Sequence, residues 1–477
     1  MLGLGLNVSA AGGEPPTALF YGLGLPNGAD YGWVSNISDN GAVIAGWVRI
    51  GGLTRAYRWS DEAGFVLLDQ PPFWSQSGVH ALSADGTTAV GVVFDGANAL
   101  PCVWRISEPC TVLISPPGQR AAALACNFDG SVITGTAWSE NLQAALIWSG
   151  NSAYVCGPGR AVGVDRSGKI VLLDKPPTLW TEQGSVVFGG GYGNALSPDG
   201  TAVAGHSQGA SGPYGWAWSQ QRGWAMVHDS LRMHTSACTA VSENGEVVAG
   251  EYFYGASGTL LWTKATGTVD LRALLASKGA DVSNWQLQHA MAISSDGSFI
   301  AGTGVYTMPD GSTRSEPWRA RLLLMISTGP DSSSQCLGDT ARLNAHAVGV
   351  GPVTYSWQIT DPMANGGWRT LVDGPTGNGS VIAGAGTDAM SIQQIGLADA
   401  GTYRCRVSNI HGSQDSQVAT ITVCAADVDC SGFVDLDDYG AFVHRFEAGD
   451  DDADFDRSGF VDTDDFTAFV LAFEQGC

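Results

Sequence analysis

The chain has 477 residues, of which 44% are hydrophobic and only 14% charged, so it can bury sizeable cores and is not a disordered protein. Its 65 glycines favour short strands joined by tight turns over long helices. A net charge of -23 excludes the phosphate backbone of nucleic acids as a partner, and the lack of any 18-residue apolar run excludes a transmembrane helix.

The first residues, MLGLGLNVSAA, resemble the end of a secretory signal peptide. A short apolar run leads to Val8-Ser9-Ala10, a small-residue cleavage site. Ten cysteines occur without a C-x-x-C or H-E-x-x-H motif, which favours disulfides in an oxidising compartment over a thiol-redox or zinc site. We therefore expect a secreted or cell-surface protein, with residues 1–18 as a signal-peptide remnant and N-terminal arm.

An internal repeat dominates residues 19–324. Its first marker is a turn of the form S-x-D-G, as in Ser83–Gly86 and Ser197–Gly200, followed by a β-branched strand that ends in glycine. Related turns carry a glycine at 41, 130, 168, 245 and 297. A tryptophan follows these seven glycines by 18, 18, 18, 12, 18, 17 and 21 residues. The tryptophans are Trp59, Trp104, Trp148, Trp180, Trp218, Trp262 and Trp318.

Asp-Gly and Asn-Gly turns join antiparallel strands, and one large aromatic side chain per repeat would fill a constant gap between neighbouring sheets. Several short strands per repeat predict a seven-bladed β-propeller with a short, degenerate fourth blade. Motifs such as Ala81–Gly86 and Tyr57-Arg58-Trp59 resemble the extracellular HAF-type repeats of secreted bacterial proteins. That resemblance implies a propeller outside the cytoplasm and no general catalytic role.

Residues 325–424 have a different pattern. Cys336, Trp357 and Cys405 occur in the order found in immunoglobulin sandwiches, and Tyr403 stands two residues before Cys405, at the tyrosine-corner position. This segment resembles an immunoglobulin-like domain of the intermediate set. The resemblance implies a Cys336–Cys405 disulfide between two sheets and a role either as a spacer or in adhesion.

Residues 425–477 contain 15 acidic residues and two arginines, a balance of -13. Two loops 27 residues apart, starting at Asp427 and Asp454, place oxygen-bearing groups at positions 1, 3, 5, 7, 9 and 12 and glycine at position 6. This is the ligand spacing of an EF-hand calcium loop, and the hard Ca²⁺ ion prefers such oxygens. We expect two Ca²⁺ ions, bound by Asp427, Asp429, Ser431, Phe433 (carbonyl), Asp435, Asp438, Asp454, Asp456, Ser458, Phe460 (carbonyl), Asp462 and Asp465.

After each loop, apolar residues recur at helical spacing, so two helices should pack face to face. These stripes are Tyr439, Phe442, Val443 and Phe446, then Phe466, Phe469, Val470 and Phe473. No helix is predicted to enter either loop, and the arrangement resembles a type I dockerin. The resemblance implies calcium-dependent attachment, with a cohesin-like scaffold domain or another surface component as partner. Positions 10 and 11, Leu436-Asp437 and Thr463-Asp464, depart from the familiar Ser-Thr pair, so metal binding carries over better than cohesin binding.

The remaining cysteines leave several pairings open. Cys102 and Cys110 could bridge one hairpin, and Cys477 could pair with Cys424 or Cys430. Connectivities that involve Cys126, Cys156 or Cys238 cannot be deduced from spacing.

The sequence contains no G-x-S-x-G elbow or phosphate-binding loop, and we expect His80 and His289 to serve packing. The function we expect is a non-catalytic binding or adhesion protein, with the propeller as recognition platform, glycan as one candidate ligand and the acidic module as attachment. The alternative is a polysaccharide-active enzyme with its site in the propeller funnel, for which Asp69, Asp174 and Asp229 are candidate carboxylates. Two carboxylates or three arginines that converge there would favour the enzyme.

Overall fold

The computed structural model describes residues 18–477 except 141, 151, 211, 228–234, 255, 323, 350–351, 365–366, 410–411, 451–452, 456–457 and 477. The proposed signal-peptide remnant therefore lies almost wholly outside the described residues. The protein is mainly β, as expected, and divides into two compact units. Unit 1 comprises residues 1–324 and 348–350, and unit 2 comprises residues 325–347 and 351–477. Within the described residues, no helix is long and apolar enough to cross a membrane.

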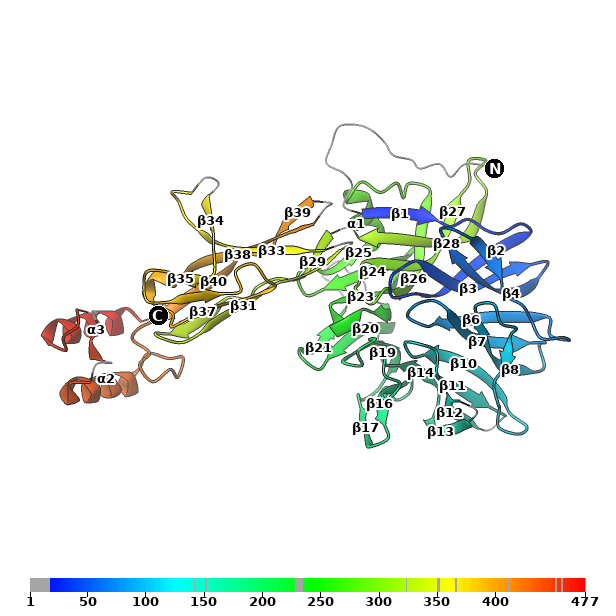
Figure 1. Cartoon of the computed structure of the whole chain (residues 1–477), viewed down its shortest axis with the longest axis horizontal. Coiled ribbons are helices and arrows are strands. Elements are labelled where there is room, and N and C mark those ends of the chain that lie inside the picture. Colours follow the sequence, from blue (N-terminus) through cyan, green and yellow to red (C-terminus); the bar gives the residue numbers. More distant parts are fainter. Residues whose placement is uncertain are drawn as a thin grey trace. The chain divides into compact units, whose positions relative to one another are not determined.

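Unit 1 consists of small antiparallel strand groups that follow one another along the chain (Figure 1). We number them 1 to 7. Group 1 comprises β2 (Ala29–Ile37), β3 (Val43–Ile50), β4 (Leu53–Ser60) and β5 (Gly64–Leu67). Group 2 comprises β6 (Gln76–Leu82), β7 (Thr88–Phe94), β8 (Ala99–Arg105) and β9 (Thr111–Val112). Group 3 comprises β10 (Arg120–Cys126), β11 (Val132–Trp138), β12 (Gln143–Ser149) and β13 (Ser152–Pro158). Groups 4 and 5 are β14 (Ala161–Val164), β15 (Val171–Leu173), β16 (Thr178–Thr181) and β17 (Gly184–Val187); and β18 (Tyr192–Leu196), β19 (Ala202–Gly209), β20 (Gly212–Ser219) and β21 (Gly223–Met226).

Groups 6 and 7 complete the series. They are β22 (Ser236–Val241), β23 (Val247–Tyr254), β24 (Ala256–Thr263) and β25 (Gly267–Asp270), followed by the short helix α1 (Leu271–Ser277); and β26 (Trp285–Ile293), β27 (Phe299–Thr307) and β28 (Thr313–Leu322). The N-terminal strand β1 (Ala18–Gly22) pairs antiparallel with β28 and so supplies the fourth strand of group 7. One parallel pair, Tyr31 of β2 with Ser315 of β28, joins groups 7 and 1 into a single eight-stranded sheet. The first strand of each group contacts the first strand of the next, and β26 contacts β2, so the series of contacts is closed.

The predicted turns recur in all seven groups, and in each the side chain at the start of the turn accepts the backbone N–H five residues further on. In group 2, the Ser83 hydroxyl donates to Asp85 (2.7 Å) and accepts the backbone N–H of Thr88 (2.9 Å). Ser197 in group 5 and Ser294 in group 7 make the same pair of contacts. The turn glycine has a φ of +69° to +78° in all seven groups, a conformation that favours glycine. The S-x-D-G motif is thus explained by local bonding.

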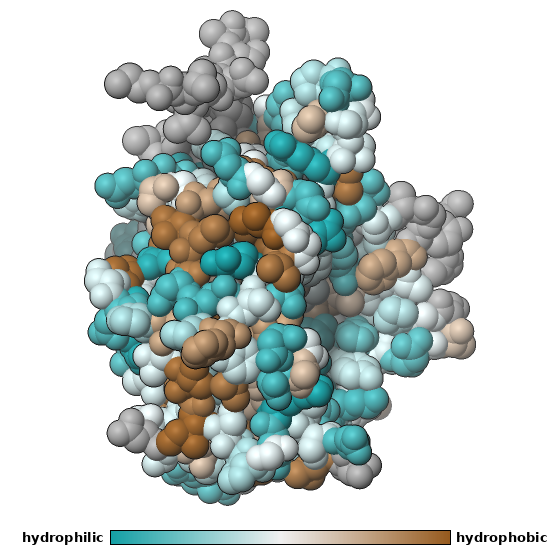
Figure 2. Space-filling model, turned by 90° about the vertical axis from the view of Figure 1, so that its right-hand side faces the viewer, coloured by the Kyte–Doolittle hydropathy of each residue, from teal (hydrophilic) through white to brown (hydrophobic). Residues whose placement is uncertain are grey.

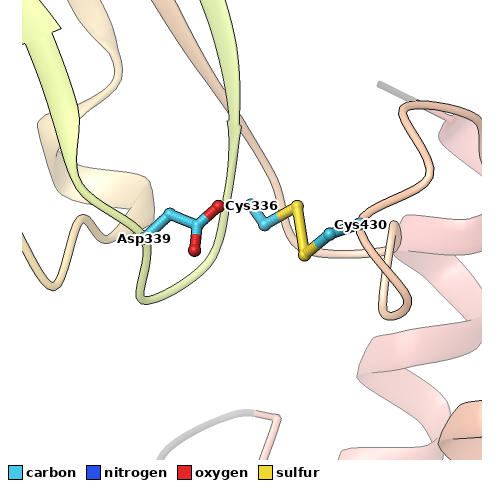
Figure 3. A group of neighbouring side chains, drawn as sticks. All are labelled: Cys336, Asp339 and Cys430. Carbon is cyan, nitrogen blue, oxygen red and sulfur yellow. A yellow bond between two sulfur atoms is a disulfide. The ribbon is translucent and has the colours of Figure 1, made fainter.

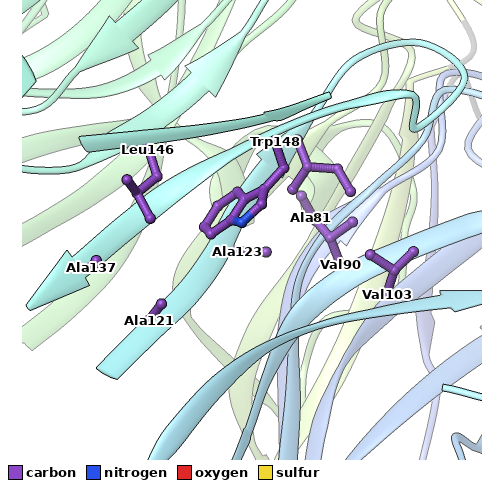
Figure 4. Close-up of a cluster of buried hydrophobic side chains, with 9 residues drawn as sticks. Ala81, Val90, Val103, Ala121, Ala123, Ala137, Leu146 and Trp148 are labelled. Atoms are coloured by element: carbon purple, nitrogen blue, oxygen red, sulfur yellow. The ribbon is translucent and has the colours of Figure 1, made fainter. Parts of the chain in front are cut away.

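The tryptophans pack between neighbouring groups, as the sequence predicts. Figure 4 shows Trp148 of group 3 among side chains of groups 2 and 3, including Val90 and Val103. Trp148 is 2% exposed, and its indole N–H donates to the carbonyl of Ile114 (2.7 Å). Trp104 likewise packs on Ala45 and Ala56 of group 1 and donates to a carbonyl, that of Asp69 (2.8 Å).

The outermost strands carry much of the exposed apolar surface of unit 1. Val66 on β5, Val155 on β13, Val187 on β17 and Trp224 on β21 are all about half exposed. On the face drawn in Figure 2, apolar residues gather in separate groups with hydrophilic residues between them. The core therefore lies between the inner strands, where burial is nearly complete.

Unit 2 begins with a β-sandwich. One sheet has the order β30 (Ser333–Cys336), β40 (Ala419–Cys424), β38 (Gly401–Asn409), β33 (Thr354–Thr360) and β34 (Trp368–Thr370), with β39 (Gly412–Asp415) on β38. The other has the order β31 (Ala341–Asn344), β37 (Ala389–Gln393), β36 (Val381–Ala383) and β35 (Gly374–Pro375), and β29 (Leu324–Thr328) pairs with β32 (His346–Gly349). Trp357 is fully buried, and the Tyr403 hydroxyl donates to the carbonyl of Asp399 (2.5 Å), which confirms the tyrosine corner.

The expected Cys336–Cys405 disulfide is wrong. Cys336 is bonded to Cys430, 94 residues further on, as Figure 3 shows, and Cys405 is a buried free thiol. The reason is topological: β30 and β38 both pair with β40, so Cys336 and Cys405 lie in the same sheet and no bond between them could join two sheets. The facing strand β31 contains no cysteine, and the buried residue directly after it is Ala345.

Two further disulfides bear on the open pairings. Cys102 and Cys110 are bonded and bridge one hairpin of group 2. Cys424 is also disulfide-bonded, while Cys477 lies outside the described residues.

The C-terminal part of unit 2 has the two expected helices, α2 (Leu436–Ala448) and α3 (Thr463–Gln475). Phe442 and Phe469 are fully buried and stack at 4.0 Å between ring centroids, so the two predicted stripes do pack together. Asp435 and Asp462 cap the helices by accepting backbone N–H groups of their first turns.

Candidate functional site

A β-bulge occurs in the first strand of every group of unit 1, at a constant distance from the turn. In group 1 the register shifts between Val34 and Asn36, and the extra residue is Ser35, six residues before the turn glycine. Bulges re-aim a side chain, and here they direct one residue per group to a common centre. This bulge ring consists of Ser35, His80, Leu124, Val162, Asn194, Thr239 and Met291.

A cavity of about 300 Å³ lies at this centre and is lined by residues of all seven first strands or the turns that follow them. Its wall includes the whole bulge ring. Four of the seven bulge residues, Ser35, His80, Asn194 and Thr239, are polar, and Asp39 and Arg166 also belong to the lining, so the interior offers several polar groups.

Polar members of the bulge ring link neighbouring groups. His80 Nδ1 lies 2.8 Å from the carbonyl of Ala123 in group 3, and Asn194 Nδ2 lies 2.7 Å from the carbonyl of Cys238 in group 6. Thr239 donates in the same way to the carbonyl of Ala290 in group 7. Each acceptor immediately precedes the next bulge, so these side chains replace direct backbone pairing between groups.

His80 gives a pH-dependent prediction. Burial lowers the pKa of His80 below its usual value, so protonation favours the unfolded chain, and stability is lost as pH falls through the unfolded-state pKa. His80→Asn should keep the link, because Asn194 makes it in group 5, and remove the titration. Thermal unfolding at pH 7 and pH 5 should show a smaller loss of melting temperature in the variant. An equal loss in both proteins would contradict this.

The turns form a second ring at one end of the cavity, four residues after the bulges. This turn ring consists of Asp39, Ala84, Phe128, Arg166, Pro198, Glu243 and Ser295. Backbone N–H groups of Asp39, Ala84, Arg166 and Glu243 donate to the carbonyl of the next member, at 2.6–3.0 Å. These bonds tie successive groups together at this end.

Arg166 crosses the turn ring. Its Nη2 lies 3.3 Å from a carboxylate oxygen of Asp39, 3.4 Å from one of Glu243 and 3.1 Å from the Ser295 hydroxyl. Burial, partly offset by Arg166, raises the pKa of Asp39. One cation therefore holds two carboxylates at this end through its Nη2, and the Arg166 side chain is 43% exposed.

A third ring lies two residues before the bulges, on the opposite side from the turns. These residues, which we call the mouth ring although none of them belongs to the lining of the cavity, are Trp33, Gly78, Ala122, Arg160, Tyr192, Ala237 and His289. Most members face a partner on the second strand of their group, such as Trp47 beside Trp33 and His206 beside Tyr192. Reactive and aromatic residues are concentrated in groups 4 to 7 and 1.

Contacts across groups organise this mouth. His289 Nδ1 lies 2.5 Å from a carboxylate oxygen of Glu251, and the Trp33 ring lies 5.0 Å from the His289 ring. Tyr192 and His206 stack at 5.0 Å. Burial lowers the pKa of His206, and the nearby Glu251 carboxylate partly opposes this, so burial favours the uncharged imidazole.

Of the carboxylates expected for an enzyme, Asp69 and Asp174 do not line the cavity, whereas Asp39 and Glu243 meet on Arg166 at its turn end. Asp174 is 8% exposed, and both of its oxygens accept from Arg160, at 3.0 and 2.7 Å. Asp69 accepts the backbone N–H of Cys110, away from the cavity lining. Asp229 lies outside the described residues.

The first acidic loop of unit 2 brings three of its predicted ligands together. One carboxylate oxygen from each of Asp427, Asp429 and Asp438 lies within 4.8 Å of the others. Cys430 and Gly432 have φ values of +60° and +87°, which bend the loop around this centre. Ser431 donates to the carbonyl of Phe433 (3.2 Å), so these two predicted ligands also lie beside each other.

Asp438 is fully buried and accepts the backbone N–H groups of Val428, Asp429 and Asp435 at 2.7–3.1 Å. Burial alone would raise the pKa of Asp438, but these bonds outweigh it and the pKa is lowered. A charged carboxylate with further lone pairs is the donor that Ca²⁺ prefers, so the residues fit this ion.

The second loop repeats these contacts. Asp454 accepts the N–H groups of Ser458 and Gly459, as Asp427 accepts those of Ser431 and Gly432. Asp465 is fully buried and accepts the N–H of Asp462 (2.8 Å), and the carbonyl of Phe460 accepts from Ser458. Asp456 lies outside the described residues.

Comparison with known families assigns one domain of the chain. Residues 325–423 match the immunoglobulin I-set domain. This I-set domain is the sandwich of unit 2. Among solved structures, a chain of the titin M10–obscurin-like 1 Ig complex is similar, with 22% identity and a TM-score of 0.17 over 21% of this chain and 92% of that one. Dpr1 IG1, solved bound to DIP-eta IG1, is 20% identical with a TM-score of 0.17, and covers 21% and 94%.

Unit 1 and the acidic loops have no such family assignment. TolB from Acinetobacter baumannii is 15% identical with a TM-score of 0.35, and the match covers 47% of this chain and 62% of that one. Comparison with curated protein sequences gives no match.

Proposed function

We propose that this is an extracellular, non-catalytic binding protein in which unit 1 recognises a ligand and the C-terminal loops bind two Ca²⁺ ions for attachment. In this proposal unit 1 is a seven-bladed β-propeller of HAF-type repeats, closed by β1 on β28, and the I-set domain joins it to a dockerin-like module. A cohesin-like scaffold domain or another surface component is the proposed attachment partner.

The observation that carries the proposal is the convergence of Asp427, Asp429 and Asp438 within 4.8 Å in a loop whose contacts recur in the second loop. Two Ca²⁺ ions would reduce the charge of residues 425–477 from -13 to -9 and relieve its self-repulsion. At ten times the dissociation constant, each ion would add about 1.4 kcal/mol to the stability of the folded module.

Calcium titration of the metal-free full-length protein tests this proposal. Calorimetry should show two binding events with dissociation constants of about 10⁻⁴ M or tighter. Circular dichroism should show a loss of helical signal from α2 and α3 after chelation. An absence of heat at millimolar calcium, or an unchanged helical signal after chelation, would contradict it.

A matched pair of variants separates coordination from charge. Asp429→Asn removes a ligand of the first loop, and one binding event should disappear. Asp437→Asn removes the same charge from an exposed position in the first turn of α2 that is not a predicted ligand, and both events should remain. Equal losses in both variants would indicate non-specific attraction to the acidic surface.

The alternative of a polysaccharide-active enzyme has two observations in its favour, the His289–Glu251 pair at the mouth and the convergence of Asp39 and Glu243 at the turn end of the cavity, where Arg166 engages both carboxylates. Glycoside hydrolysis ordinarily needs two carboxyl groups on opposite sides of the bond. The other carboxylate of the mouth, Asp174, is held by Arg160. We therefore favour binding over catalysis.

A further inference from the structure

The mouth ring has one chemically rich side and one bare side. Gly78 and Ala122, in the neighbouring groups 2 and 3, place no polar group on the bare side, while Ala237 of group 6 lies on the rich side beside Glu251 of the same group. A Cβ at Gly78 would lie 3.6 Å from the Trp47 ring. Trp47 therefore packs against the buried Gly78 of group 2. The residue types of the mouth ring therefore differ from group to group. In the cores between groups, by contrast, every group contributes similar apolar side chains.

Flat aromatic faces form a row on the rich side. Tyr31 and Trp47 stack at 5.3 Å with 19° between their planes, and Trp47 and Trp33 stack at 6.2 Å with 16°. Trp33 then contacts the His289 ring. Tyr31, Trp33 and Trp47 belong to group 1 and His289 to group 7, and none of these four side chains is fully buried. Aromatic side chains that are partly exposed in a row offer contact area at a small entropy cost.

Hydrogen-bonding groups lie next to this row. Glu251 is 17% exposed at its side chain and His289 29%, so both are largely withdrawn from solvent and orient each other. Asn194 contacts His206 (3.0 Å) while it holds the carbonyl of Cys238. A few placed polar groups beside aromatic surface are the usual composition of a small-ligand site.

The charge of the mouth selects among ligand classes. Arg160 and Lys175 are balanced by Asp174 and Glu251, in a protein whose net charge is -23. A polyanion would be repelled by the molecule as a whole, and a cation would find no net negative charge at the mouth. An uncharged ligand with apolar faces and several hydroxyl groups satisfies both the aromatic row and the hydrogen-bonding groups.

From this geometry we infer that the mouth binds the end of a neutral oligosaccharide, with a sugar ring against Trp33, which adjoins His289, and its hydroxyl groups on Glu251 and His289. This inference rests on the proposed function of unit 1 as a recognition platform. It does not depend on calcium binding by unit 2.

The test uses the full-length protein on an array of malto-, cello-, xylo- and galacto-oligosaccharides, with heparin and polygalacturonate as anionic comparisons. At least one neutral series should bind, and calorimetry should then give its affinity. Trp33→Ala and the nearly isosteric Glu251→Gln should each weaken binding at least tenfold. Trp224→Ala, which removes a half-exposed tryptophan from the outer strand β21, should leave the affinity unchanged.

Three results would overturn the inference. Binding of anionic polymers alone, or of no saccharide, would refute the ligand class. Neutral binding that survives Trp33→Ala and Glu251→Gln would place the site elsewhere, while the recognition role itself would stand. Glu251→Gln guards against a folding artefact, because it changes no volume, and circular dichroism should confirm that both variants are folded.

Discussion

Trp148→Ala should lower the free energy of unfolding of unit 1 by about 3–5 kcal/mol, because it leaves a cavity in the buried contact between groups 2 and 3. The indole is 2% exposed and packs on Val90, Val103 and Leu146. The variant would also leave the carbonyl of Ile114 without the indole N–H that it accepts at 2.7 Å. Differential scanning calorimetry of the full-length protein should show the transition of unit 1 at a markedly lower temperature.

Trp224→Ala is the matched control for this prediction. It deletes the same side chain from β21, where the indole is 54% exposed, so the transition should move by far less. Equal shifts in the two variants would show that the interior position of Trp148 is not what stabilises unit 1.

The repeat of unit 1 could be predicted wherever a local bond requires a particular residue type. Serine and aspartate recur in the turns because the Ser83 hydroxyl and the Asp85 carboxylate satisfy backbone groups within five residues. Tryptophan recurs because each gap between groups has a similar size. Both signals are read from residue type and spacing alone, so the sequence predicts them well.

The bulge ring could not be predicted in the same way. Its members range from Ser35 and His80 to Leu124 and Met291, because a bulge constrains the backbone and leaves the side chain free. His80 and His289 look alike in the sequence, since each precedes an alanine, yet one lies in the bulge ring and the other in the mouth ring. The functional geometry of the mouth therefore emerges only from the fold.

The disulfide of the I-set domain shows a related limit. Cys336 stands at a plausible distance before Trp357, but it belongs to β30 and not to the strand that faces β38. A spacing argument cannot distinguish two neighbouring strands of the same domain. Because Cys430 lies at position 4 of the first acidic loop, the bond fastens that loop to the sandwich and has no counterpart in the second loop.

Gly91→Ala should destabilise unit 1 by about 1–3 kcal/mol, although alanine adds only a methyl group. Gly91 lies on β7 opposite the bulge at His80, and a Cβ there would stand 2.0 Å from the carbonyl oxygen of Gly78. Backbone cannot yield as a flexible side chain can, so the bulge itself would have to shift. The same approach occurs at Gly46, Gly135, Gly205, Gly250 and Gly302, at 1.9–2.2 Å.

Thermal unfolding of Gly91→Ala beside Gly190→Ala measures the cost of displacing the bulge. Gly190 is exposed, and no atom lies within 4 Å of a Cβ placed there, so its variant should unfold like the unmodified protein. The displaced bulge of group 2 carries His80, so Gly91→Ala should also weaken the link from His80 to Ala123. If Gly91→Ala kept its melting temperature, the close approach of β6 and β7 at the bulge would not be what requires glycine here. The recurrence of glycine opposite each bulge would then need an explanation other than the backbone geometry that shapes the central cavity.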